Sequence, residues 1–226
     1  MRPVFALLAG LLLATAANAL SLADISGKDA GAGLKEALTQ GAGKAVDLLG
    51  KPDGFLGNPK VKIPLPASVK KVEGIMRGLG MGRQADELVT AMNRAAEAAV
   101  PKAKTLLVNS IKQMSVEDAK GILTGGEDAA TQYFRRTTSG PLAEQFKPIV
   151  RSAIAKVKLA EKYDQFAGKA SKFGLVREQD AHLEDYVTQK TLDGLYLMIA
   201  EEEKAIRHDP AGAAGNLAKK VFGALK

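Results

Sequence analysis

Apolar residues recur at the spacing of an α-helix through most of the 226 residues. Over residues 29–49 they share one face, and Gly50 is placed to end that helix. No strand-like segment alternates with helical segments in the way that a parallel sheet requires. The pattern therefore predicts an all-α fold, a single bundle-like domain over residues 20–226. Further helices are expected over residues 67–80, 115–123, 127–136 and 183–207.

Prolines interrupt the longest helical patterns. Pro101 lies inside the pattern over residues 83–114, where it removes the hydrogen bond to the carbonyl of Glu97 and predicts a kink. Pro141 follows a Ser-Gly pair and suits the first position of a new helix, in which Pro148 would make a second kink. We therefore expect kinked helices, with a boundary just before Pro141.

Residues 51–66, KPDGFLGNPKVKIPLP, break the helical pattern with four prolines and two glycines. Val61, Ile63 and Leu65 alternate with lysine and proline, so we expect an extended apolar strap on the surface of the helices. Each large apolar side chain contributes about 1.5–3 kcal/mol if fully buried. We therefore predict that the strap is ordered although it has almost no regular secondary structure.

The start of the chain has the three regions of a secretory signal peptide. Arg2 precedes an apolar run over residues 4–13, and an Ala-Asn-Ala pattern ends at Ala19. The run is too short to span a bilayer of about 30 Å as a helix, although a membrane anchor is the alternative. We expect residues 1–19 to be removed after Ala19 and residues 20–226 to reach a periplasm. With no cysteine, the chain forms no disulfide there.

Charge and motifs argue against several function classes. The net charge of +7 is spread along the chain, without the dense basic and aromatic patch of a nucleic-acid-binding protein. The glycine-rich stretches at 41–44 and 78–83 follow no predicted strand, so neither is expected to bind phosphate. His182 among acidic residues is typical of a solvated cluster rather than of a metal site. No nucleophile motif occurs, and we expect no cofactor and no metal.

The last residues, 211–226, indicate a Gly/Ala hinge and a short tail helix. Leu217 and Val221 lie on one side of that helix, and Lys219 and Lys220 on the other. A basic amphipathic helix of this kind either docks on the protein core or lies on an anionic membrane surface. We favour docking on the core.

Four longer phrases resemble a known family: GFLGNPKVKIPLP, MNRAAEAAVPKA, GILTGGEDAATQYFRR and LDGLYLMIAEEEKAIRHDP. They are similar to exported bacterial proteins catalogued only as a domain of unknown function, and the similarity extends from about Leu20 to the tail. The resemblance implies a mostly helical periplasmic domain and brings no activity, substrate or catalytic residue. It also draws attention to polar residues that lie within the predicted helices.

Acidic residues interrupt the apolar stripe of the helix over residues 183–207. Glu202 and Glu203 fall between Ile199 and Ile206 on that stripe. A buried carboxylate without partners costs several kcal/mol. Because Glu202 lies closer to the line of the stripe, we expect Glu202 to point inward and to meet an arginine or several donors of another helix, as a lock between helices. The leading candidates for that arginine are Arg94 and Arg135.

Two hypotheses of function follow. We favour a non-catalytic binding or scaffold protein that holds an apolar ligand, such as a lipid, or a partner's helix. The alternative is an enzyme, which needs its polar groups to converge in a cleft. Arg94 and Glu97, however, lie opposite the apolar stripe of their helix, on a face expected to be solvated. The candidate polar cluster consists of Asn93, Arg94, Glu97, Thr131, Tyr133, Arg135, Asp193 and Glu202.

Overall fold

The described part of the chain is all-α, as predicted. The computed structural model describes residues 26–67, 80, 82–161, 163–164, 182–210 and 215–224. The predicted signal peptide and nearly all of the predicted helix over 67–80 lie outside these residues. Within them are seven α-helices, one 3-10 turn (η2) and no strand: α1 (Gly27–Leu49), α3 (Gly82–Ala99), η2 (Val100–Lys102), α4 (Ala103–Gln113), α5 (Val116–Thr124), α6 (Ala129–Ile154), α8 (Leu183–His208) and α9 (Asn216–Gly223).

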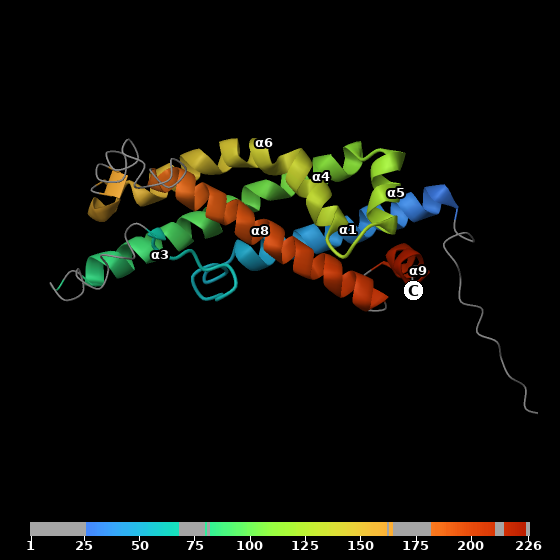
Figure 1. Ribbon diagram of the computed structural model, residues 1–226, viewed down its shortest axis with the longest axis horizontal. Helices are drawn as coiled ribbons and strands as arrows, with labels where there is room; N and C mark the ends of the chain where they lie inside the picture. Colours follow the sequence, from blue (N-terminus) through green and yellow to red (C-terminus); the bar gives the residue numbers. More distant parts are fainter. Residues whose placement is uncertain are drawn as a thin grey trace, which may run out of the picture.

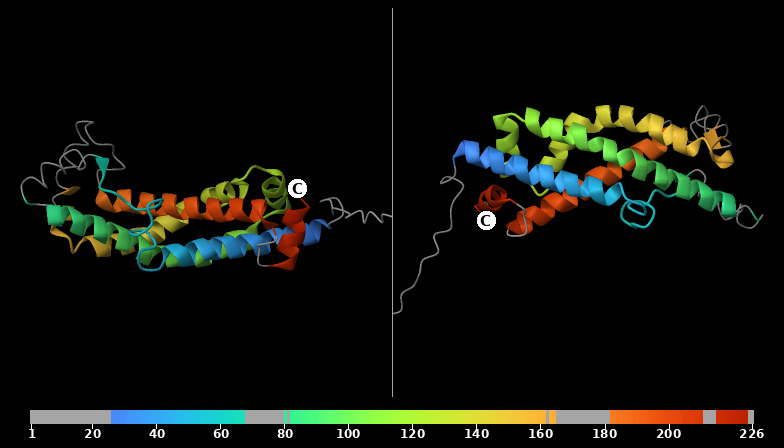
Figure 2. Two further views of the ribbon diagram at one scale, coloured as in Figure 1. Left: turned by 90° about the horizontal axis from the view of Figure 1, so that it is seen from below. Right: turned by 180° about the vertical axis from the view of Figure 1, so that it is seen from behind.

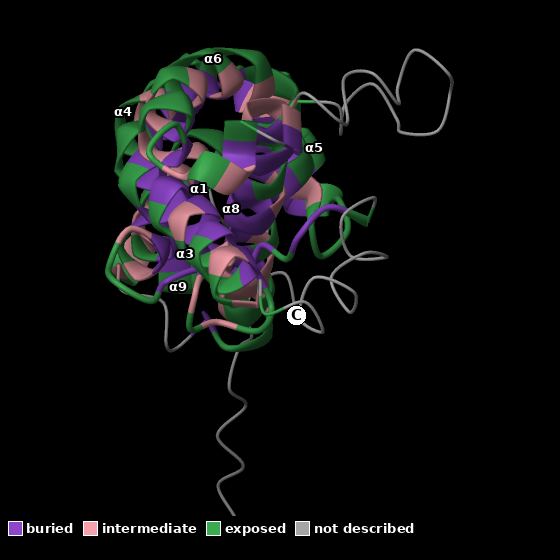
Figure 3. Ribbon diagram, turned by 90° about the vertical axis from the view of Figure 1, so that its left-hand side faces the viewer, coloured by how far each residue is buried: buried purple, intermediate pink, exposed green. Residues whose placement is uncertain are grey.

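The helices form one elongated domain in which α8 is central. Helix α6 lies along α8 and α3, while α1 packs against α8, α4 and α9 (Figures 1 and 2). Viewed along the long axis, the buried residues line the inward faces of these helices (Figure 3). The described helices include none that is long and apolar enough to cross a membrane.

The helix ends follow local sequence signals. Helix α1 begins after Ser26, whose hydroxyl accepts a hydrogen bond from the N–H of Asp29 at 3.1 Å, and it ends at Gly50. Ser115 and Asp118 form the reciprocal capping box at the start of α5 that their spacing predicts. These ends need no tertiary contact, because each cap lies within three residues of the groups it satisfies.

The prolines act differently from each other. At Pro101 the long helical pattern passes through the 3-10 turn that separates α3 from α4, in line with the predicted kink.

The predicted boundary before Pro141 is wrong, because α6 continues through both Pro141 and Pro148. The reason is packing. Phe134 and Leu142, on either side of Pro141, are both fully buried, and each contributes about 1.5–3 kcal/mol against the roughly 3 kcal/mol that a proline costs inside a helix.

The strap over residues 51–66 is ordered, without helix or strand. Four of its five large apolar side chains are buried, and Leu56 is half-buried. The strap approaches α8 so closely that a Cβ on Gly194 would lie 2.7 Å from the ring of Phe55. The strap therefore lies on the surface as predicted, because Lys60, Lys62 and Pro64 are exposed, while its apolar side chains reach into the core. Its buried apolar residues are Phe55, Val61, Ile63 and Leu65.

The tail helix docks on the start of α1. Val221 and Phe222 of α9 are buried, and Leu217 is half-buried; Leu225 lies outside the described residues. The two helices touch at Gly33, where a Cβ would lie 2.7 Å from Cγ2 of Val221 and 2.8 Å from the carbonyl oxygen of Leu217. Only a glycine allows this distance, because the obstructing atoms include backbone.

Gly31 and Gly33 provide a matched test of that contact. Gly33→Ala is expected to displace α9, and therefore to lower the melting temperature and speed amide exchange over residues 216–223. A Cβ on Gly31 meets no atom within 4 Å, so Gly31→Ala is expected to raise the free energy of unfolding by about 1 kcal/mol through helix propensity. Calorimetry and hydrogen exchange measure both effects. If Gly33→Ala and Gly31→Ala change the melting temperature and the amide exchange of α9 equally, α9 does not dock at Gly33.

Candidate functional site

Asn93 of α3 is fully buried and binds the backbone of the strap. Its side-chain oxygen accepts the N–H of Ile63 at 2.8 Å, and its side-chain nitrogen donates to the carbonyl of Ile63 at 2.9 Å and to that of Val89 at 2.8 Å. The amide thus pairs with both polar groups of Ile63, as a neighbouring strand would. All its hydrogen-bonding atoms are engaged in packing the strap.

Glu97, one turn further along α3, binds the other end of the strap. One carboxylate oxygen accepts the N–H groups of Phe55 and Leu56, both at 3.0 Å, and the other accepts from Arg94 at 2.6 Å. Arg94 also pairs with Asp53 at 2.8 Å. The hydrogen bond to Glu97 raises the pKa of Arg94 above its ordinary value. The prediction of a solvated face is wrong for Glu97, because the strap covers it.

A buried glutamate of α8 caps the start of α6. The Glu203 side chain is 3% exposed. Its two oxygens accept the N–H of Ala130 and the N–H and hydroxyl of Thr131, each at 2.9 Å. The first N–H groups of a helix have no partner within it, and Asp128, which precedes α6, makes no side-chain cap. Glu203 supplies the cap from another helix, and its charge suits the positive end of α6.

The prediction that Glu202 is the inward carboxylate is wrong. The Glu202 side chain is 17% exposed and pairs at 2.9 Å with Lys44, which is 72% exposed, rather than with Arg94 or Arg135. Helix α8 packs against α6 on one side and α1 on another, so two faces of it are covered. Glu203 faces α6, and Glu202 faces α1. The arginine partner of the buried glutamate is Arg207, one turn along α8, at 2.9 Å.

The remaining cluster residues make separate contacts between helices. The hydroxyl of Tyr133 donates to the carbonyl of Ser110 at 2.7 Å and ties α6 to α4. Arg135 lies 4.7 Å from the ring centre of Tyr196 and 3.6 Å from Asp193. The eight candidate residues therefore lie in several places and do not converge on one cleft. Nor does the described part of the chain bring together three or more metal-ligating side chains.

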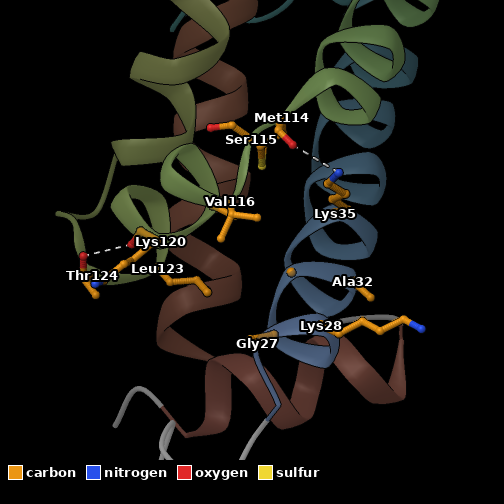
Figure 4. A pocket seen from close by; sticks show the side chains of 13 residues that line it. Gly27, Lys28, Ala32, Lys35, Met114, Ser115, Val116, Lys120, Leu123 and Thr124 are labelled. Carbon is orange, nitrogen blue, oxygen red and sulfur yellow. Dashed lines mark hydrogen bonds between the residues drawn. The ribbon is translucent and has the colours of Figure 1, made fainter.

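An apolar groove lies between the start of α1 and α5 (Figure 4). Its volume is about 580 Å³, which is within the range of about 300–1,000 Å³ typical of small-ligand pockets. Lys35 reaches toward Met114 at one end, and Gly27 lies at the other. The side chains of Val116 and Leu123 project from α5 toward α1, and Val116 is 80% exposed. This groove is the best candidate for a binding site among the described residues.

The groove exists because the first turns of α1 carry almost no side chains. A Cβ on Gly27 or Gly31 would meet no atom within 4 Å, and Ala30 and Ala32 add only methyl groups. None of the candidate residues predicted from the sequence lies in this groove. The available signal was the small-residue run GKDAGAG in a helix, together with an apolar Val116 directly after a helix cap.

A second groove of about 410 Å³ lies between the strap and α8. Its lining includes Lys60, Lys190, Asp193 and the 41% exposed Leu197. Three of its four charged groups are already paired, Lys60 with Glu201 at 2.7 Å and Lys190 with Asp193 at 4.0 Å, and the fourth is Lys62. We therefore regard it as the weaker candidate.

Asn93→Ala tests the strap contact. The substitution leaves the N–H and the carbonyl of Ile63 buried without partners, at about 1–3 kcal/mol each. We expect a lower urea midpoint and faster amide exchange at Ile63. Thr90→Ala, at an exposed position of the same helix, is the control. It is expected to change neither the urea midpoint nor the amide exchange rate at Ile63. Unaltered exchange at Ile63 in the Asn93 variant would count against the contact.

Glu202 and Glu203 are adjacent, so their glutamine variants form a second matched pair. Glu203→Gln removes the charge from a buried pair and is expected to cost roughly 3 kcal/mol. Glu202→Gln breaks only an exposed pair and is expected to cost less than about 1 kcal/mol. Thermal unfolding of both variants measures the difference. A larger loss for Glu202→Gln would show that the cap is not Glu203.

Comparison with known proteins gives a family without an assigned activity. Neither curated proteins nor solved structures gave a significant match. A family model described as "Protein of unknown function (DUF4197)" matches residues 24–223, nearly the whole chain. This agrees with the resemblance carried by the four phrases. The chain belongs to the DUF4197 family of proteins of unknown function.

Proposed function

We propose that the protein is a non-catalytic binding protein that holds an apolar ligand in the groove between α1 and α5. The observation that carries the proposal is the groove itself: about 580 Å³, lined mainly by glycine, alanine, methionine, valine and leucine. Exposed apolar surface of this kind costs free energy in water, and a ligand that covers it recovers that energy.

The engagement of the polar residues supports this proposal over an enzyme. Asn93, Glu97 and Glu203 are buried, and each binds backbone groups of another segment. Their hydrogen-bonding capacity is used in packing, so these three side chains are not available as an acid or a base in a cleft. An enzyme needs such groups to meet around open space.

The proposal suits an exported protein. A signal peptide over residues 1–19 remains a prediction of the sequence, since those residues lie outside the described part of the chain. Apolar molecules need a carrier in an aqueous compartment such as a periplasm, because water disfavours their surface. We therefore propose that the protein carries or senses an apolar molecule held in the groove. The following experiment also tests whether a helix of a partner protein occupies the groove instead.

Gly31→Leu and Gly43→Leu separate the groove from the rest of α1. Both positions have no atom within 4 Å of a Cβ, but only Gly31 lines the groove. Titration with a neutral apolar dye is expected to show binding to the unaltered protein, about tenfold weaker binding to Gly31→Leu, and unchanged binding to Gly43→Leu. Both variants are expected to keep or raise the melting temperature, because leucine favours a helix over glycine by about 0.8 kcal/mol.

Two results would contradict the proposal. One is that the unaltered protein binds no apolar dye and carries no apolar molecule detectable by native mass spectrometry. The other is that Gly31→Leu and Gly43→Leu bind the dye equally. A third result would favour a helix of a partner protein as the occupant of the groove. In that case the unaltered chain binds no dye but captures another protein, and Gly31→Leu does not capture it.

A further inference from the structure

The groove between α1 and α5 is lined by positive charge and by no negative charge. Lys28, Lys35 and Lys120 line it, and no aspartate or glutamate does. None of the three lysines forms an ion pair with a described carboxylate. Elsewhere on α1, Lys44 is paired with Glu202 at 2.9 Å. The nearby carboxylate of Asp118 is turned to Arg136 at 2.8 Å.

Lys35 is the best placed of the three. It is half-buried at the end of the groove, and its ammonium donates one hydrogen bond, to the carbonyl oxygen of Met114 at 3.4 Å (Figure 4). An ammonium group has three N–H donors, so two remain for a ligand. Lys35 has no ion-pair partner among the described carboxylates, and an anionic group at that place would supply one. Lys28, at the opposite end of the groove, is exposed.

We infer that the ligand is a single-chain amphiphile with an anionic head group, whose alkyl chain lies along the groove and whose head group pairs with Lys35. This inference rests on the proposed function. The groove follows α1 from Gly27 to Lys35, about 12 Å at a rise of 1.5 Å per residue. That length suits one alkyl chain that lies parallel to the helix with its head at the Lys35 end.

Dodecanoate and 1-dodecanol test the head group, because they share one chain and differ in charge. Each ligand displaces the neutral dye from the full chain at pH 8, with dodecanoate below its critical micelle concentration and 1-dodecanol below its solubility limit. We expect dodecanoate to bind at least about tenfold more tightly, as a charge-assisted hydrogen bond permits. Lys35→Gln is expected to abolish this preference without changing the affinity for 1-dodecanol, and Lys35→Arg to retain it. Lys28→Gln, with the same change of charge at the other end, is expected to alter the preference by less than about threefold.

The outcomes separate this inference from the proposed function. If Gly31→Leu loses dye binding but dodecanoate and 1-dodecanol bind the unaltered protein equally, the inference of an anionic head group is wrong. The proposal of an apolar binding site then still holds. Equal losses in Lys28→Gln and Lys35→Gln would overturn the role of Lys35. Binding to vesicles of anionic phospholipid, without binding to monomeric dodecanoate, would show a membrane-docking surface and overturn the inference. No binding of dye or ligand would overturn both proposals.

Discussion

A backbone N–H group that is buried without a hydrogen-bond partner costs about 1–3 kcal/mol, and two segments of this chain contain N–H groups that are satisfied only by side chains of another element. The strap has no strand beside it, and the first turn of α6 has no local side-chain cap. Three side chains supply the missing partners. Asn93 and Glu97 of α3 bind the strap, and Glu203 of α8 binds the start of α6. The packing of the strap on α3, and of α6 on α8, depends on these contacts.

The charged groups of the protein fall into two sets. The buried carboxylates are Glu97 and Glu203, and each is matched by an arginine and by backbone N–H groups. The lysines around the groove have no such partners among the described carboxylates. Asn93, Glu97 and Glu203 look misplaced in a helical sequence but bind backbone groups of other segments, whereas the lysines without an ion pair lie around the groove.

Two glycines of α1, Gly31 and Gly33, lie two residues apart and have opposite surroundings. Gly33 has no side chain because the backbone of α9 occupies that space. Gly31 also has none, but no atom occupies the space beside it, and the groove remains open. The residue type is identical, and the difference comes only from what lies on each face of α1. The groove at this end of the molecule thus depends on how α5 packs beside α1, and α9 packs at Gly33 without lining it.

The sequence by itself determined the all-α class and most helix ends, because these depend on short-range spacing and caps. It also predicted an ordered strap, because the large apolar side chains of that segment gain free energy only by burial. Only the tertiary structure decided that α6 passes through Pro141, since burial on α8 and α3 outweighs one lost hydrogen bond. The tertiary structure also decided which of the two neighbouring glutamates, Glu202 or Glu203, is the buried one. The two differ by about 100° around a helix that is covered on more than one side, so a single apolar stripe does not choose between them. The small residues of the groove can be read from the sequence, but the empty space beside Gly31 cannot, because it also depends on where the neighbouring helices lie.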